Sequence, residues 1–276
     1  MSEEEKEMSF LDHLEELRWH IIRALIAIVV FSVAAFVAKD IVFGKIILGP
    51  SKPDFWTFRM LCKAGELLNS EGLCIDELPF IIQSRKMTGQ FSMHLTSSFV
   101  IGLILAFPYA FWEAWRFISP GLYNKEKSLA SGATFWVSLL FMCGVLFGYF
   151  IITPLSVNFL ANYQVDSSVM NEFDIVSYVG TVTMLVLACA ILFQLPIVVY
   201  FLTKAGIINP ALMKTYRKHA IIIILILGAM LTPPDPVSQI LIAIPLFALY
   251  QISILISASV YRKEQKALAK FENDAT

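Results

Sequence analysis

The chain has 276 residues, of which 57% are hydrophobic and only 16% are charged, and 21 Lys and Arg residues nearly balance 22 Asp and Glu residues. Soluble domains carry about 25% charged residues, and a mean hydropathy of +0.70 exceeds what a soluble fold of this length can bury. The composition excludes disordered, collagen-like and disulfide-rich miniprotein classes, and a net charge of −1 argues against nucleic-acid binding. We therefore predict an all-α polytopic membrane protein.

Apolar runs typical of membrane helices recur six times along the chain, each helix needing about 20 mainly apolar residues. The expected spans are residues 21–38, 91–112, 128–152, 175–203, 220–231 and 237–261. The fifth has 12 residues, too few to cross a bilayer core unaided, and a short turn separates it from the sixth. We predict six transmembrane helices, with spans five and six short.

Lys and Arg residues are unevenly distributed between the connections. With the N-terminus inside, 14 of the 21 fall in inner segments, and the outer connections after spans three and five hold none. Because basic residues concentrate in cytoplasmic loops, we expect both termini in the cytoplasm. The expected regions are a cytoplasmic N-terminus 1–19, a six-helix membrane domain 20–262 and a cytoplasmic tail 263–276. The acidic start lacks a cleavage pattern, so no signal peptide is expected.

The first outer connection, residues 44–90, is the largest polar segment, and we expect it to cover the extracytoplasmic face. Cys62 and Cys74 lie in it, on the oxidising side of the membrane. A disulfide between them and two free thiols are equally open, and the bond would contribute about 2–3 kcal/mol. Cys143 and Cys189 fall inside spans, where we expect small buried side chains.

Motifs for nucleotide phosphates, metals and hydrolytic nucleophiles are missing from the sequence. It contains no G-x-x-x-x-G-K-[ST], no H-E-x-x-H and no G-x-S-x-G. His20 and His219 fall at predicted membrane edges, where an interfacial role is expected, and His94 in the second span is ambiguous. We expect no enzymatic activity, no metal and no cofactor.

The N-terminal segment 8–18 has the spacing of an amphipathic helix. Its apolar positions recur at i, i+4 and i+7, namely Phe10, Leu14 and Leu17. Such a helix should lie along the inner membrane surface, but surface helices are usually basic, and Glu15 and Glu16 make this one acidic. A cationic protein partner and a solvated acidic face are equally supported.

Two further segments have residues that are unusual for their predicted position relative to the membrane. The inner connection after span two has a Pro120-Gly121 turn, flanked by Phe117 and Glu126, in a segment that should be mainly polar. Gln194 lies deep in the fourth span, where its amide needs partners. Gln239 and Gln251 in the sixth span pose the same question, which interhelical hydrogen bonds would answer.

Three of these segments resemble signatures of TatC, the multispanning core subunit of the twin-arginine protein translocase. They are FLDHLEELR at 10–18, FISPGLYNKE at 117–126 and LTPPDPVSQ at 231–239. The resemblance implies a receptor for folded precursors that carry a paired-arginine signal peptide, driven by the proton-motive force. Glu16 and Glu126 would bind the two guanidiniums through charge-assisted hydrogen bonds. Phe117 would pack against the peptide, and Arg18 would orient the acids.

The resemblance also implies partners and a location. Single-span TatA- and TatB-type subunits, self-association in a larger complex and a multi-pass place in the cytoplasmic (inner) membrane are expected. Gln194 would contact a partner helix, but the family often has a glutamate there, and a glutamine cannot titrate. Pro50 and Asp235 are expected to have structural roles on the extracytoplasmic face.

A small-molecule secondary transporter is the alternative from another class. Such transporters have inverted repeats and charged or broken helices at the membrane midplane. Prolines at 154, 196 and 245 could break helices, but no internal repeat is apparent, and we expect the spans to contain no acids. These features favour the translocase receptor.

Overall fold

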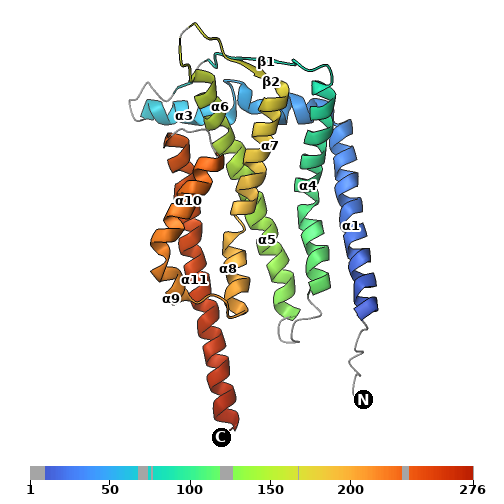
Figure 1. Ribbon diagram of the computed structural model, residues 1–276, viewed down its shortest axis with the longest axis vertical. Helices are drawn as coiled ribbons and strands as arrows, with labels where there is room; N and C mark the ends of the chain where they lie inside the picture. The colour runs from blue at the N-terminus through green and yellow to red at the C-terminus, as the bar shows by residue number, and fades with distance from the viewer. Residues whose placement is uncertain are drawn as a thin grey trace. The chain divides into compact units, whose positions relative to one another are not determined.

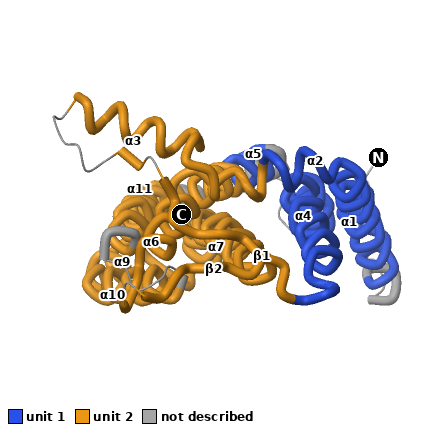
Figure 2. The backbone as a smooth tube through the Cα atoms, turned by 90° about the horizontal axis from the view of Figure 1, so that it is seen from above, with its two compact units in different colours: residues 1–45, 86–139 blue, residues 46–85, 140–276 orange. Residues whose placement is uncertain are grey.

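The computed structural model is mostly helical (Figure 1), and it describes residues 10–67, 74–75, 77–118, 127–166, 168–231 and 236–275. The longer helices are α1 (Phe10–Val37), α3 (Trp56–Leu67), α4 (Gly89–Ile118), α5 (Lys127–Phe147), α6 (Thr153–Asn162), α7 (Ile175–Leu192), α8 (Leu195–Lys204), α10 (Arg217–Leu231) and α11 (Pro236–Ala275). The short elements are α2 (Lys39–Ile41), η1 (Val42–Ile47), η2 (Gly49–Ser51), η6 (Gly148–Ile152), α9 (Pro210–Thr215), β1 (Ile81–Gln83) and β2 (Glu172–Asp174). Two compact units result: unit 1 holds residues 1–45 and 86–139, and unit 2 holds residues 46–85 and 140–276 (Figure 2).

Five helical stretches within the described residues are long and apolar enough to cross a membrane. They are Leu14–Val37, Gly89–Ile118, Thr134–Asn162, Ile175–Lys204 and Gln239–Lys263. The sixth apolar helix, α10, has 15 residues. At 1.5 Å per residue it extends only about 22 Å, less than the roughly 30 Å hydrocarbon core. The predicted all-α membrane protein with six apolar helices and a short fifth span is therefore confirmed.

Three boundaries differ from the sequence prediction. The N-terminal amphipathic segment is not a separate helix, because α1 continues without a break into the first span, and no Gly or Pro interrupts residues 10–37. The sixth span is not short, since α11 has 40 residues and continues through the expected boundary at residue 262. The third span extends to Asn162 through the π-helical turn η6, which precedes Pro154 in α6. Proline lacks the N–H of a regular helix and favours such a turn.

In unit 1, α1 and α4 lie side by side along most of their length (Figures 1 and 2). They approach most closely where Gly102 faces Ser32. A Cβ at Gly102 would lie 2.1 Å from the Ser32 Oγ and 2.5 Å from its backbone nitrogen, so a larger residue does not fit. Further along, the His94 ring stacks on Phe36 with centroids 4.0 Å apart. Close approach at small residues is the usual means of helix association in membranes.

The described residues of unit 2 include a buried apolar core. The buried cluster joins helices of the third to sixth spans through Ile152, Leu185, Cys189, Ile224, Ile242 and Leu246. Burial of Cys189 confirms the prediction for that residue, whereas Cys143 is exposed, contrary to it. Gly144 lets α5 approach α7, because a Cβ there would lie 2.7 Å from the Ala190 Cα.

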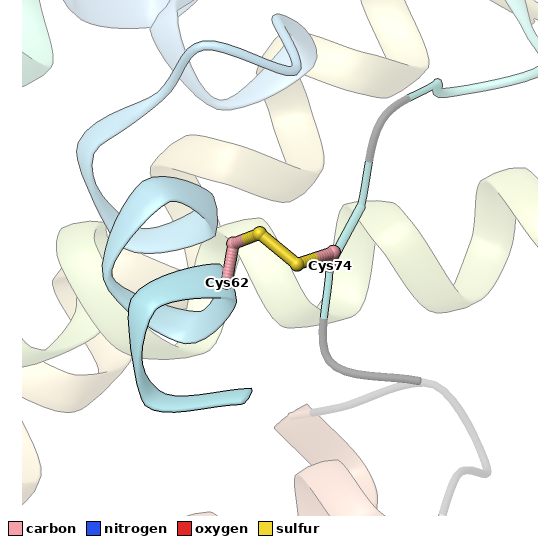
Figure 3. Close-up of a disulfide and its surroundings, with 2 residues drawn as sticks. All are labelled: Cys62 and Cys74. Carbon is pink, nitrogen blue, oxygen red and sulfur yellow. A yellow bond between two sulfur atoms is a disulfide. The ribbon is translucent and has the colours of Figure 1, made fainter. Parts of the chain in front are cut away.

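The polar segment that precedes α4 folds onto unit 2. Cys62 on α3 and Cys74 form a disulfide (Figure 3). Pro50 is buried in η2, and the Tyr178 hydroxyl donates to the Ile47 carbonyl at 3.0 Å. Strand β1 pairs in parallel with β2. The described residues of this segment are therefore joined to α7 by the Tyr178 hydrogen bond and to β2 by strand pairing.

Candidate functional site

A buried carboxylate lies between α1 and α4 near the N-terminal end of α1. Glu113 on α4 is only 1% exposed. The Tyr109 hydroxyl donates to its Oε1 at 2.7 Å, and His20 Nδ1 donates to its Oε2 at 2.5 Å. The Arg23 guanidinium lies 3.8 Å from the same Oε2. A buried carboxylate is strongly disfavoured unless it is paired and hydrogen-bonded, and here α1 supplies two basic neighbours, His20 and Arg23.

His20 stands between two carboxylates. Its Nδ1 contacts Glu113, and its Nε2 faces the Glu16 Oε1 at 3.9 Å, an ion-pair distance longer than a hydrogen bond. Glu16, His20 and Arg23 share one helix face because they are spaced by four and three residues. The His20 ring therefore hydrogen-bonds the buried Glu113 and lies within ion-pair distance of Glu16.

The structure brings two of the four predicted signal-peptide residues together. Phe117 on α4 lies beside His20, with ring centroids 6.2 Å apart, and the Glu16 carboxylate lies 3.9 Å from His20 Nε2. The Glu16 side chain is 39% exposed, so it remains accessible from outside the helix pair. The predicted fourth residue, Glu126, lies outside the described residues.

Arg18, the remaining predicted residue, does not contact Glu16. Its guanidinium lies 3.6 Å from Glu15, with both side chains exposed, and 5.6 Å from the centroid of the Trp19 ring. The ion pair of Arg18 is therefore with Glu15 and not with Glu16, and a role of Arg18 in orienting the two acids stays a prediction. The basic neighbour of Glu16 is His20.

Sequence reasoning missed Glu113 and Tyr109 altogether. The second span was expected to end at Trp112, one residue before Glu113, and the expectation that the spans contain no acids is therefore wrong. His20 was interpreted as an ordinary membrane-edge residue, whereas it is buried against α4. The available signal was that Glu113 is the one acidic residue of α4, four positions from both a tyrosine and a phenylalanine.

The other candidate residues take structural positions. Gln194 occupies the break between α7 and α8, where its backbone carbonyl accepts from the N–H groups of Ile197 and Val198. The predicted interhelical bond is confirmed for Gln239, which donates to the Leu225 carbonyl at 3.3 Å, but Gln251 Nε2 has no hydrogen-bond partner among the described residues. Asp235 lies outside those residues. No group of three or more His, Cys, Asp or Glu within the described part of the chain is placed to hold a metal.

Six apolar helices and a charged cluster between two of them define a multispanning membrane protein with a polar site at one end of a helix pair. Residues 12–245 match the family model described as Sec-independent protein translocase protein (TatC). A TatC from Blattabacterium sp. subsp. Periplaneta americana is 39% identical over 266 residues, 96% of this chain and all of that protein, and Bacillus subtilis TatCy is 31% identical over 95% and 94% of the two chains. A crystal structure of a twin-arginine translocase receptor, TatC, in DDM superposes with a TM-score of 0.68 and 33% identity, covering 89% of this chain and 99% of that one.

The chain belongs to the TatC family of Sec-independent protein translocase proteins. It is therefore an integral membrane protein and a twin-arginine translocase subunit, in a family named for a translocase component and not for a catalyst.

Proposed function

We propose that this chain is the receptor subunit of the translocase and that it binds the paired arginines of signal peptides at the Glu16 end of α1 and α4. The observation that carries the proposal is the grouping of Glu16 and Phe117 around His20. It places an accessible carboxylate and an aromatic ring from two helices at one end of unit 1.

The chemistry of the peptide fits this grouping. A guanidinium presents a planar fork of donors to a carboxylate, and such charge-assisted bonds are roughly twice as strong as neutral ones. Glu16 would accept one arginine of the pair, and Glu126 is proposed to accept the other. Phe117 supplies an apolar surface for the residues that follow. A lysine pair presents point charges without the fork and would bind less well.

The proposed topology places this end in the cytoplasm, because 14 of the 21 basic residues fall in inner segments of an N-in arrangement. Residues 1–19 and 263–276 would be cytoplasmic, and residues 20–262 would form the domain of the inner membrane. TatA- and TatB-type single-span subunits would join through intramembrane contacts such as Gln194. Self-association in a larger complex and use of the proton-motive force complete the proposal.

Site-specific photocrosslinking tests this function. A crosslinker at Glu16 or Phe117 should capture a precursor whose signal carries Arg-Arg and should capture the Lys-Lys version much less. A crosslinker at Met87, fully exposed on the segment before α4, is the control and should show no such preference. Equal capture of both precursors from Glu16 and Phe117 would contradict the carboxylate–guanidinium model.

Export measurements provide a second test. Glu16→Ala and Glu126→Ala should each abolish export of twin-arginine precursors while the chain remains inserted at its normal level. Wild-type export in both variants would show that these residues are not the site. The transporter alternative is not retained, because the family match covers nearly the whole chain.

A further inference from the structure

If Glu16 binds the signal peptide, as proposed above, the basic side chains near Glu16 affect how available its carboxylate is. Two basic side chains, His20 and Arg23, lie one and two turns along α1 from Glu16, on the same face. An acid with such neighbours tends to pair with them, and a paired acid has less to offer an incoming guanidinium. A receptor that uses Glu16 therefore needs to keep these cations away from it.

The distances show which carboxylate each of the two basic side chains contacts. His20 contacts Glu113 at 2.5 Å but stands 3.9 Å from Glu16, and the Arg23 guanidinium also faces Glu113, at 3.8 Å. Glu113 is almost completely buried, whereas 39% of the Glu16 side chain is exposed. Electrostatic attraction is stronger between buried groups than between exposed ones, so His20 and Arg23 favour the buried acid.

We propose that Glu113 is an internal counter-ion that holds His20, the one of the two basic side chains within ion-pair distance of Glu16, and thereby leaves the Glu16 carboxylate available to the signal peptide. Glu113 is then a positioning residue that acts through His20 and does not itself touch the peptide. Among the described residues, His20 is contacted by Glu16 from α1 and by Glu113 and Phe117 from α4. Arg23 from α1 and Tyr109 from α4 contact Glu113 instead. Arg116, the basic residue in the last turn of α4, lies over the Trp112 ring.

Removing the counter-charge tests the proposal. Glu113→Gln keeps the side chain's size but frees the imidazolium to pair with Glu16. A labelled Arg-Arg signal peptide should then bind the purified full-length chain in nanodiscs about tenfold more weakly at about pH 5.5, the range for losing one charge-assisted bond. Imidazole is neutral at about pH 8.5, so the competitor disappears there and the affinity should return to within about twofold of wild type.

The double variant separates this account from a merely structural one. Glu113→Gln with His20→Gln removes both the counter-ion and the basic side chain within ion-pair distance of Glu16, and should restore most of the affinity at the lower pH. Damage to packing would instead persist in the double variant and at both pH values. The matched control is Glu172→Gln, which breaks the Arg85–Glu172 ion pair of unit 2 and should leave peptide affinity and its pH profile unchanged.

Several outcomes would overturn the proposal. Wild-type affinity for Glu113→Gln at about pH 5.5 would do so, as would a loss that does not depend on pH or on His20. If the Glu113→Gln variant does not accumulate, the peptide affinity of the double variant is compared with that of His20→Gln alone. Equal affinities support the counter-ion role of Glu113. A further loss of fivefold or more in the double variant contradicts that role. A wild-type chain that binds Arg-Arg and Lys-Lys peptides equally would instead contradict the proposed function, which distinguishes the two failures.

Discussion

The two units of this chain hold their helices together in different ways. In unit 1, α1 and α4 meet through Gly102, a stacked histidine and the Glu113 cluster, and much of the apolar surface of α1 remains exposed, for example Val29 at 58% and Val33 at 57%. In unit 2, large apolar side chains from several helices are buried together, with Leu185 and Ile242 each 1% exposed.

This difference indicates that unit 1 serves recognition, whereas unit 2 maintains the stability of the fold. A buried charge stabilises a helix pair poorly compared with apolar side chains of the same size, so its presence in unit 1 calls for a functional reason. Unit 2 has the dense apolar contacts that maintain a membrane fold. Substitutions in unit 2 should therefore reduce stability, whereas polar substitutions at the Glu16 end of unit 1 should change recognition.

The largest expected effect on stability is in the core of unit 2. Leu185→Ala leaves a cavity where the side chain is fully buried and should lower the free energy of unfolding by about 2–5 kcal/mol. Met184→Ala, its neighbour on α7 that is 56% exposed, is the control and should cost much less. Thermal unfolding in detergent measures both. Similar losses from the two variants would show that the core cluster is not the basis of unit 2's stability.

The corresponding site in unit 1 is the close contact of α1 and α4. Gly102→Leu forces the helices apart at Ser32 and should cost about 2–3 kcal/mol, a typical overpacking penalty. Gly180→Ala on α7 is the control, because a Cβ there meets nothing within 4 Å, and alanine should be neutral or slightly stabilising. Normal stability of the Gly102 variant would mean that the helices of unit 1 tolerate separation.

The disulfide of unit 2 should have a local effect. Cys62 and Cys74 are separated by 12 residues, and closing such a loop contributes about 3 kcal/mol at most. The Cys62→Ser, Cys74→Ser pair should make residues 52–86 more susceptible to protease while peptide binding in unit 1 is retained. Loss of Arg-Arg discrimination in this variant would show that the two units are not functionally separate.

The smallest expected effect lies in the turn between α6 and β2. Ser168 donates to the Asp166 carboxylate from its backbone N–H at 2.8 Å and from its hydroxyl at 2.6 Å, and these hydrogen bonds lower the pKa of Asp166. A lowered pKa means that the turn is supported at neutral pH and loses this support as pH falls through the carboxyl's titration. Ser168→Ala should raise the Asp166 pKa toward its ordinary value, as measured by NMR titration. An unchanged pKa would show that the hydroxyl does not contribute.

Much of the fold could be predicted because each membrane helix corresponds to an uninterrupted run of apolar residues in the sequence. The apolar runs place the six helices, and the brevity of the fifth run predicts that α10, which has 15 residues, is short. The continuity of α1 was missed because its first turns have a different polar pattern from the span that follows, although nothing between them breaks a helix. The π-helical turn η6 was missed because its backbone follows from Pro154 in the next helix and not from its own residues.

The candidate site was half predicted. Glu16 and Phe117 were found because they stand in segments whose local composition is unusual. Glu113 and His20 were not, because their importance depends on a contact between residues 93 positions apart, which no local pattern contains. The role of Arg18 was taken from the family resemblance, and the structure pairs this residue with Glu15, three positions earlier on the same helix.

The central claim is that Glu16 recognises a guanidinium at this end of unit 1, and peptide discrimination tests it most directly. Affinities of Arg-Arg and Lys-Lys signal peptides are measured for the wild-type chain and for Glu16→Gln. The account predicts that the wild type prefers Arg-Arg by about tenfold, the value of one charge-assisted bond, and that Glu16→Gln loses most of this preference. A Glu16→Gln chain that keeps the full preference, or that loses affinity equally for both peptides, would contradict it.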